Sequence, residues 1–376
     1  MSNYGVMEQI LDLARWAPSG DNTQPWRFEI VDGLKVVVHG FDTRDHVVYD
    51  LDGRPSQISL GALLETMSIA ASAHGLSMQV HRRVGLPDTT PTFDVQFVED
   101  ASRRLDPLIT SILGRSVQRR PMSTRSLTPL EKKALEASVG SDYRILWIEG
   151  FRDRFRTASL MFRNAKLRLT MPEAYRVHRD IIQWNTRFSE DRVPDQALGI
   201  DPLTARLMRF VMVSWRRVEF FNTYLAGTWA PRIQMDFIPS LACAAHFVIK
   251  AQRKPTSVDD FVAAGRAVQR FWLTLTQLGL FQQPEMTPLI FGSYVRNGVQ
   301  FTSFAKLAKV ARQVEVATRN VVGADIDCAI WMGRVGAGSA PISRSTRRPL
   351  DQLMYRGERG HQTPEAFLAM RFPQGS

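Results

Sequence analysis

Two helix-like segments with the same glycine spacing place the strongest constraint on how this chain of 376 residues folds. Gly61 and Gly75 lie fourteen residues apart and enclose an apolar-rich run, as do Gly265 and Gly279, and a leucine follows the second glycine in both cases. Because fourteen residues is close to four helical turns, each pair of glycines is expected to lie on one helix face and to permit close packing there. This spacing alone does not establish that the two segments are copies, because it also arises by chance.

The elements around these two segments recur in a similar order. The first hundred residues predict a compact α/β unit with these elements: a helix over 7–16, a hairpin with strands on either side of Asp32-Gly33, a helix over 57–73, and strands over 78–82 and 92–98. From Arg103 the order begins again with these elements: a basic helix over 104–115, a helix over 129–138, a strand in the segment YRILWI and a helix over 258–278. An internal duplication is therefore the better interpretation.

The duplication predicts how the chain is divided. The predicted parts are a first, truncated repeat over 1–102, a second repeat over 103–354 and a C-terminal arm over 355–376. A helical stretch rich in Arg and aromatic residues, at about 151–230, has no counterpart in the first unit and is predicted to be an insertion. Its segment 207–229 is compatible with a nucleic-acid or membrane surface, but helical spacing favours a packed helix with Arg on its rim. The predicted fold class is α+β, with mainly antiparallel central sheets flanked by helices.

The composition is that of an ordinary globular protein. Apolar residues make up 44% and charged residues 23% of the chain, which excludes a disordered or fibrous protein. Cys243 and Cys328 are too few for a disulfide scaffold, and a thiol-reducing compartment fits them best. No apolar stretch is long enough to span a bilayer, and the N-terminus shows no secretory signal pattern. We therefore expect a cytoplasmic protein.

Arginine carries most of the basic charge. The net charge is +11, and 40 of the 48 basic residues are Arg, because only eight are Lys. Arginine grips phosphates and carboxylates at two points, so the excess is compatible with nucleic acid, with a phosphorylated cofactor or with a genome that favours Arg codons. Codon preference explains even scatter but not the two clusters, six Arg between Arg103 and Arg125 and six between Arg334 and Arg359.

The segment ARWAPSGDNTQPW, which ends at Trp26, is the most informative part of the chain. Two prolines and a glycine between a helix and a strand hold its backbone in an extended, unpaired form. Ser19, Asn22 and Gln24 then offer hydrogen-bonding groups to something other than a β-ladder. The alternative is an Asx-type turn that joins helix to strand, with Trp26 in the core, and the residue chemistry alone leaves both interpretations open.

The pattern A-P-S-G-x-N-x-Q-P-W resembles the signature of the nitroreductase superfamily of flavin enzymes. In that family this loop lies over the isoalloxazine ring of FMN bound to the other half of a dimer. The resemblance therefore implies a nitroreductase-like fold, here as a fused pseudo-dimer. It assigns these residues to the flavin ring: Pro18, Ser19, Gly20, Asn22 and Gln24.

Three further segments resemble the tandem-duplicated, Acg-like branch of that family. The segment RSVQRRPM at 115–122 is similar to the Arg-rich segment that holds the FMN phosphate, with Val117 where a hydroxyl residue is usual. The segment GLFQQP at 279–284 resembles the one that approaches the flavin N5 edge, and 334–349 resembles the closing segment whose basic pair reaches the phosphate. The resemblance assigns these residues to the cofactor: Arg115, Arg119, Gln283, Pro284, Arg347 and Arg348.

These segments are distributed unevenly between the two repeats. The ring-covering loop is in the first, whereas both phosphate segments and the N5 segment are in the second. If two nitroreductase copies were fused and lost complementary halves of their sites, one complete site would remain, so the resemblance implies one FMN per chain and a second, degenerate site. The insertion would lie over the flavin and shape the substrate pocket, with Trp184, Arg187 and Trp215 as guesses for lining residues.

The predicted function is that of an FMN-dependent oxidoreductase that transfers hydride or electrons from NAD(P)H to a small organic substrate. NAD(P)H rests on the resemblance alone, because the chain has no dinucleotide fingerprint. The flavin carries the chemistry, so no side chain need be catalytic. Alternatives are a flavin-binding or flavin-sequestering protein without turnover, a partner-dependent flavin enzyme in a biosynthetic pathway and, more remotely, a basic nucleic-acid binder. We expect no metal, nucleic-acid or membrane partner, and a pseudo-dimer that is monomeric or associates further.

Overall fold

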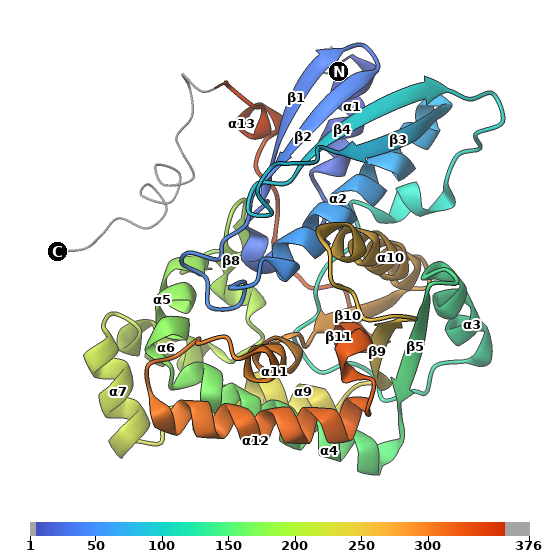
Figure 1. The fold of residues 1–376 in the computed structure, drawn as a ribbon. Helices are drawn as coiled ribbons and strands as arrows, with labels where there is room; N and C mark the ends of the chain where they lie inside the picture. Colours follow the sequence, from blue (N-terminus) through green and yellow to red (C-terminus); the bar gives the residue numbers. More distant parts are fainter. Residues whose placement is uncertain (1–4, 358–376) are drawn as a thin grey trace.

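The computed structural model of the chain describes residues 5–357. Within this range the chain forms two four-stranded antiparallel sheets flanked by helices (Figure 1). The helices are α1 (Val6–Ala14), α2 (Arg54–Ala71), α3 (Pro129–Ser138), α4 (Gly150–Leu169), α5 (Pro172–Ile181), α6 (Pro202–Val211), α7 (Trp215–Tyr224), α8 (Trp229–Pro231), α9 (Ile238–Leu241), α10 (Val258–Gln277), α11 (Thr287–Asn297), α12 (Ala305–Val322) and α13 (Leu350–Leu353). The strands are β1 (Trp26–Asp32), β2 (Lys35–Gly40), β3 (Leu76–Arg82), β4 (Thr92–Glu99), β5 (Tyr143–Ile148), β6 (Ile182–Gln183), β7 (Phe188–Ser189), β8 (Val193–Pro194), β9 (Ala245–Ala251), β10 (Leu280–Pro284), β11 (Ala329–Ala337) and β12 (Arg344–Ser345).

The two main sheets arrange their strands in the same order. The first has the order β1-β2-β4-β3, and the second, read from its β5 edge, has the order β5-β9-β11-β10. In each sheet the strands are arranged first, second, fourth and third along the chain, and a long helix, α2 or α10, leads from the second strand to the third. The prediction of a mixed α/β fold with antiparallel sheets flanked by helices is confirmed.

Helices α2 and α10 pack against each other through two glycines. A Cβ added to Gly61 would lie 2.0 Å from the carbonyl oxygen of Val262, and a Cβ added to Gly265 would lie 2.0 Å from that of Ile58. The two glycine Cα atoms face each other across the same crossing. Because glycine is the one residue without a Cβ, it is the one residue that permits backbones to approach this closely.

The second glycine of each pair lies beyond the end of its helix, where the sequence also predicts that Gly75 stops the helix. Gly75 and Gly279 have positive φ values of 66° and 69°, and each follows the end of its helix and precedes an edge strand. The expectation that both glycines of a pair lie on one helix face was therefore wrong. In both units the first glycine permits the helix crossing, and the second supplies the left-handed residue that stops the helix.

One expected helix is absent. The segment 104–115 contains only a short 3-10 turn, Pro107–Ser111, where a basic helix was predicted. Proline disfavours helical geometry at the residue before it, and Asp106 is extended, with φ −74° and ψ 120°. The Asp106 side chain instead caps the turn by accepting a hydrogen bond from the Leu108 N–H at 3.0 Å.

The last described residues return to the first sheet. Leu350 and Leu353 of α13 are buried in the apolar core that α1, α2 and the first sheet form. The Tyr355 N–H donates to the Phe28 carbonyl at 2.7 Å, and its ring stacks on His39 with centroids 3.9 Å apart. The predicted second repeat, 103–354, thus contributes a helix to the core of the first. The predicted arm, 355–376, lies outside the described residues from 358 onward.

The insertion leaves its outermost helices exposed. Helices α4 to α9 all lie between β5 and β9, and α6 and α7 project from the edge of the molecule (Figure 1). These two helices bury only Thr204 and Val218. The expectation of a packed helix over 207–229 is therefore wrong for most of that segment. A second helical segment, α11 and α12, lies between β10 and β11 and was not predicted.

Within residues 5–357, no helix combines the length and the apolar character that crossing a membrane requires. The same residues contain no group of three or more His, Cys, Asp or Glu side chains positioned to hold a metal ion.

Candidate functional site

The loop between α1 and β1 has an unusual backbone. Asp21, Asn22 and Gln24 all have positive φ, at 50°, 60° and 51°. For residues that carry a side chain this region costs roughly 1–2 kcal/mol each. Ser19 stabilises the loop from within, because its Oγ accepts a hydrogen bond from the Gln24 N–H at 3.0 Å. The remaining strain must be offset by contacts with other parts of the chain.

Two amide side chains of this loop supply those contacts. Asn22 Nδ2 donates to the carbonyl oxygens of Glu190 at 3.0 Å and Thr346 at 3.2 Å. Gln24 Nε2 donates to the Glu190 carbonyl at 2.8 Å, and Gln24 Oε1 accepts from the Arg348 N–H at 3.0 Å. The loop thereby fastens the insertion and the closing segment to the first sheet. Asn22 Oδ1 is buried and has no hydrogen-bond partner among the described residues.

Four arginines converge where this loop, the segment before residue 116 and the closing segment meet. We call them the arginine cluster: Arg15, Arg115, Arg344 and Arg347. The guanidinium of Arg115 lies 4.5 Å from the ring centroid of Trp272. Those of Arg15 and Arg344 lie 5.5 Å and 5.2 Å from the ring of Trp16. Two indole rings therefore form walls beside the cluster.

Three members of the cluster form no ion pair with a carboxylate within residues 5–357. They donate to backbone carbonyl oxygens instead: Arg115 Nη2 to Trp16 at 3.2 Å, Arg344 Nη1 to Leu113 at 2.9 Å, and Arg347 Nε to Ala17 at 2.9 Å. The fourth, Arg15, pairs with Asp12 at 2.7 Å. Arg115 and Arg347 are both buried, and Arg115 Nε has no hydrogen-bond partner in the described part of the chain. The cluster therefore carries excess positive charge inside the protein.

The lowered pKa values of Arg115 and Arg347 reflect this excess of positive charge. Burial lowers the pKa of Arg115 well below its usual range, and the charges of Arg347 and Arg344 lower it further. Burial, followed by the charges of Arg344 and Arg15, lowers the pKa of Arg347 to about 9. In each case the charged form is disfavoured because like charges are held together away from water. A phosphate dianion would stabilise these charges through charge-assisted hydrogen bonds, so the residues present fit a phosphate group.

Two of the predicted phosphate ligands lie outside the cluster. Arg348 forms an ion pair with Asp191 at 2.8 Å. Arg119 donates weakly to the Ala197 carbonyl at 3.4 Å. Burial lowers the pKa of Arg119 to about 10, although Asp21 opposes that change, and Arg334 is one of the cations that add to it. Of the predicted basic residues, the structure thus brings Arg115 and Arg347 together.

The predicted N5 segment lies beside the segment that contains Arg115. Residues 280–284 form β10, in which Gln283 is opposite Arg334 and Pro284 is opposite Gly333 of β11. Val117 forms a parallel β-bridge with Gln282. Gln282 Nε2 and Gln283 Oε1 are buried without hydrogen-bond partners in the described range. This edge of the second sheet therefore has buried polar atoms without partners, next to the segment that contains Arg115.

The other predicted residues are placed as follows. Pro18 is partly buried and Gly20 is exposed, and both lie in the loop between α1 and Asn22. Arg187 donates to the Ile342 carbonyl at 3.2 Å, and its own carbonyl accepts from the Arg344 N–H at 3.0 Å, so it lies next to the closing segment. Trp184 is partly buried against an apolar core that α5 shares with α11, α12 and residues 47–48. Trp215 packs on Tyr175, with centroids 5.5 Å apart, in the exposed α7. Within residues 5–357, neither tryptophan forms a hydrogen bond or a ring contact with the arginine cluster.

Arg15 and Arg344 were not predicted as site residues. Both flank segments that were singled out, since Arg15 comes directly before the Trp-Ala-Pro-Ser-Gly run and Arg344 precedes Arg347 by three residues. The only sequence signal for them was their position beside segments singled out on other grounds. Spacing within a segment does not reveal which of several arginines point inward.

A buried ion network supports the strands behind this site. Glu285 accepts from His246 Nδ1 at 2.7 Å, from Arg334 Nη1 at 3.0 Å and from Ser240 Oγ at 3.0 Å. All four side chains are almost completely buried. Burial alone would lower the pKa of His246, but the Glu285 carboxylate raises it to about 10. Burial would raise the pKa of Glu285, but His246 and Arg334 lower it to about 2. The network therefore holds charged groups inside the protein.

This network predicts a specific pH dependence of stability. A histidine whose folded pKa is raised stabilises the fold fully below its unfolded value of about 6.5, and the contribution is lost as pH rises through the folded value. We expect the wild-type protein to lose stability between pH 7 and pH 10 more steeply than His246→Gln, by more than about 1 kcal/mol over that range. Urea unfolding of both proteins across this range measures the difference. Parallel pH profiles would contradict the assignment of a charged His246.

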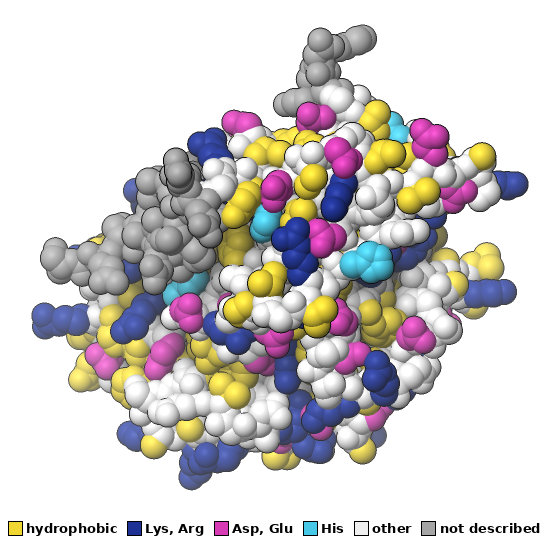
Figure 2. All heavy atoms as spheres, turned by 45° about the horizontal axis from the view of Figure 1, so that its top comes forward, with side chains coloured by type: hydrophobic (Ala, Val, Ile, Leu, Met, Phe, Trp, Pro, Cys, Tyr) yellow, Lys and Arg dark blue, Asp and Glu magenta, His cyan; other side chains and the backbone are white. Residues whose placement is uncertain are grey.

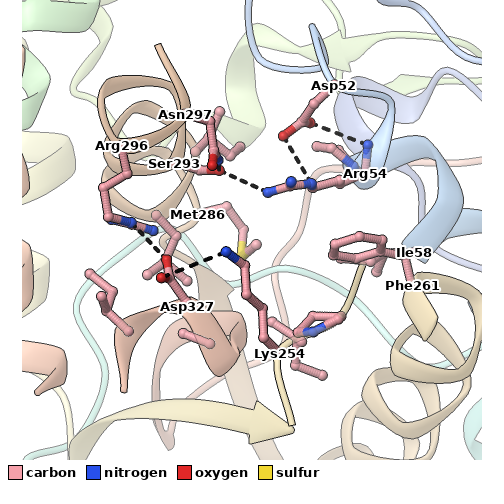
Figure 3. A pocket seen from close by; sticks show the side chains of 17 residues that line it. Asp52, Arg54, Ile58, Lys254, Phe261, Met286, Ser293, Arg296, Asn297 and Asp327 are labelled. Carbon is pink, nitrogen blue, oxygen red and sulfur yellow. Dashed lines mark hydrogen bonds and ion pairs between the residues drawn. The ribbon is translucent and has the colours of Figure 1, made fainter. Parts of the chain in front are cut away.

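A hollow lies elsewhere in the structure, between the first turn of α2, the loop before α10 and helix α11 (Figure 3). Ion pairs cross its polar wall: Arg54 with Asp52 at 3.1 Å, Arg296 with Asp327 at 2.8 Å, and Lys254 with Asp327 at 3.9 Å. Arg54 also donates to Ser293 Oγ at 2.8 Å. None of the predicted site residues lines it. Because its cations are paired with acids, it differs from the arginine cluster in having local charge compensation.

Known proteins show only a weak likeness to this chain. No protein-family model and no curated protein sequence matches the chain. Among solved structures, the chain is similar to a nitroreductase-like family protein from Bacillus cereus, with 10% identity and a TM-score of 0.33. The similarity covers 67% of this chain and 97% of that one. At this TM-score the likeness carries no argument about function, which must rest on the residues themselves.

Proposed function

We propose that the protein is an FMN-dependent oxidoreductase of the nitroreductase type, with the arginine cluster as its phosphate site. One observation carries the proposal. Arg115, Arg344 and Arg347 are held together by backbone carbonyls, with no carboxylate partner among the described residues. They lie against the loop whose sequence resembles the flavin-covering loop of that family. A buried group of unpaired arginines beside two indole rings suits a small phosphorylated aromatic ligand.

The chain's own residues would divide the work of binding. Arg115, Arg344 and Arg347 would hold the phosphate of FMN, with Arg15 anchoring the closing segment through the Arg348 carbonyl at 3.0 Å. The orphaned Asn22 Oδ1 and Gln283 Oε1 are hydrogen-bond acceptors available for the flavin or for ordered water. When bound, FMN supplies hydride and single-electron transfer. The protein's part is to anchor, orient and exclude water.

The loop would act chiefly as a clamp. Asn22 and Gln24 use most of their amide groups to hold the backbone at Glu190, Thr346 and Arg348. They would therefore position the site walls, with their backbones rather than their side chains turned to the ligand. The resemblance assigned these residues to the flavin ring, and the proposal keeps their loop in the site.

The proposal includes two fused repeats and one complete FMN site per chain. Its support is the shared strand order of the two sheets and the reciprocal packing of α2 and α10 through Gly61 and Gly265. The loop at 17–24 belongs to the first unit, and the arginines at 115 and 347 belong to the second. A site built from both units in this manner is expected to occur once.

Electron supply from NAD(P)H to a small organic substrate is part of the proposal and rests on the sequence resemblance. A flavin-binding protein without turnover is the second candidate. The insertion was expected to shape the substrate pocket, but its helices α6 and α7 are exposed, so no residues are assigned to such a pocket. Binding of nucleic acid is disfavoured as the role of the cluster, since Arg115 and Arg347 are buried and not spread over a surface.

The test is the visible spectrum of the purified protein before and after anaerobic addition of NADPH. The proposal predicts a flavin spectrum that bleaches on reduction and returns when a nitro compound or a quinone is added. A flavin that binds but stays oxidised with every donor would favour the non-reductase candidate. A colourless protein that takes up no FMN would remove both.

A further inference from the structure

The helices α6 and α7 present an unpartnered apolar face. Each helix has ten residues and buries only one side chain. Leu203 and Tyr224 are about three-quarters exposed, at 74% and 73%. The other large apolar side chains that define this α6–α7 face are Leu207, Phe210 and Phe220. A monomer rarely exposes so many large apolar side chains in one place without a partner for them.

The aromatic side chains of this face form a continuous group. Phe210 lies 6.3 Å from Phe221, Phe221 lies 6.1 Å from Phe220, and Phe220 lies 5.2 Å from Tyr224, measured between ring centroids. These contacts join α6 to α7 directly. The face is therefore one surface shared by two helices and not a set of scattered side chains.

The face is also strongly basic. Between residues 202 and 230 there are four Arg, namely Arg206, Arg209, Arg216 and Arg217, against the single acid Glu219. All four are exposed, and within residues 5–357 none forms an ion pair with a carboxylate. Arg217 lies over the Phe210 ring at 4.6 Å, so charge and aromatic surface are interleaved. On the face that Figure 2 presents, in contrast, Lys and Arg side chains are mixed with Asp and Glu.

We propose that the α6–α7 face docks the protein on the surface of an anionic phospholipid bilayer. Helices with Trp, Phe and Leu on one side and Arg around them lie flat in the membrane interface, where the stems of Arg side chains cover apolar surface and their heads reach lipid phosphates. Ten residues of helix span roughly 15 Å, half of a hydrocarbon core, so the helices lie on the membrane and do not cross it. This proposal departs from the prediction of no membrane partner, and the experiment below tests both.

Charge disfavours a second copy of this chain as the occupant. A two-fold dimer brings the same patch of each subunit together. The four unpaired arginines of one copy would then face the four of the other, with one Glu219 in each to offset them. A bilayer containing acidic lipids supplies negative charge over the whole face and apolar depth for Phe220 and Tyr224.

The test is flotation of the full chain with vesicles of phosphatidylcholine alone and of equal parts phosphatidylcholine and phosphatidylglycerol. We expect binding to the anionic vesicles alone, and loss of that binding when salt rises from about 0.1 M to about 0.5 M. The variant R206Q/R209Q/R216Q/R217Q should bind at least about a hundredfold more weakly, because each basic residue near the surface contributes roughly fivefold. The variant F220S/Y224S should also lose binding, by removing the inserted surface.

A matched variant, R104Q/R120Q/R253Q/R312Q, removes the same charge from exposed positions elsewhere and should bind like the wild type. Circular dichroism melts confirm that each variant is folded. The proposal is overturned if the wild type floats with neither vesicle, or if both arginine variants lose binding equally. It is also overturned if sedimentation shows a dimer that F220S/Y224S dissociates while no vesicle is bound, since the face would then belong to a second copy.

Discussion

Replacing Arg115 and Arg347 together by Met should lower the affinity for FMN by about a hundredfold or more, and should raise the melting temperature of the flavin-free protein. A hydrogen bond to a charged group contributes roughly 1.5–3 kcal/mol, so the loss of two such contacts is worth at least two factors of ten. The opposite effect on stability follows from the cluster itself. Burial and mutual repulsion disfavour both charges in the folded state, as their lowered pKa values express.

Methionine keeps most of the volume of the arginine stem, so the packing against Trp272 is retained while the charge is removed. Isothermal titration with FMN measures the affinity, and calorimetry measures the melting temperature. Arg120→Met is the matched control, because Arg120 lies in the same segment but is exposed. A double variant that binds FMN as tightly as the wild type would show that the cluster is not the phosphate site. A large fall in melting temperature would show that these arginines support the fold instead.

The second large effect is expected at the helix crossing. Gly265→Ala should destabilise the protein by about 4 kcal/mol, more than the 1–3 kcal/mol typical of an overpacked core. Its Cβ would lie 2.0 Å from the Ile58 carbonyl oxygen and 2.8 Å from the carbonyl carbon, and backbone atoms cannot rotate away as a side chain can. Helices α2 and α10 would have to separate, and both cores that they line would lose contacts.

Urea unfolding measures this effect, with Gly292→Ala as the control. Gly292 is also in a helix, α11, but its added Cβ would meet the end of the flexible Arg296 side chain at 3.1 Å. That change should be neutral or should stabilise the protein by up to about 1 kcal/mol, because alanine favours a helix over glycine. Equal effects at the two positions would contradict the account of the crossing.

The fold was predictable where one local signal was enough. The β1–β2 hairpin follows from Asp32-Gly33, and the ends of α2 and α10 follow from the glycines after them. The close approach of Gly61 to Gly265 was not predictable as a contact, because two residues with the same spacing need not meet. The exposure of α6 and α7 was also missed, since an apolar helical pattern does not say whether its partner is another helix of the same chain.

The site was predictable as a set of segments but not as a set of side chains. Adjacent residues on an extended backbone point in opposite directions. Arg347 accordingly points to the Ala17 carbonyl, while Arg348 points to Asp191. The same limit applies to Asn22 and Gln24, whose partners are backbone carbonyls of remote segments. Which polar groups remain for a ligand depends on tertiary contacts that no spacing encodes.

The most direct test of the phosphate site compares FMN with riboflavin, which has the same ring but no phosphate. Titration of the flavin-free protein, followed by fluorescence quenching, gives both affinities and the number of sites per chain. We expect one FMN per chain, bound about a hundredfold or more tightly than riboflavin, with most of that difference lost in the Arg115→Met, Arg347→Met double variant. Equal affinity for the two flavins, two sites per chain, or no binding of either would contradict the account.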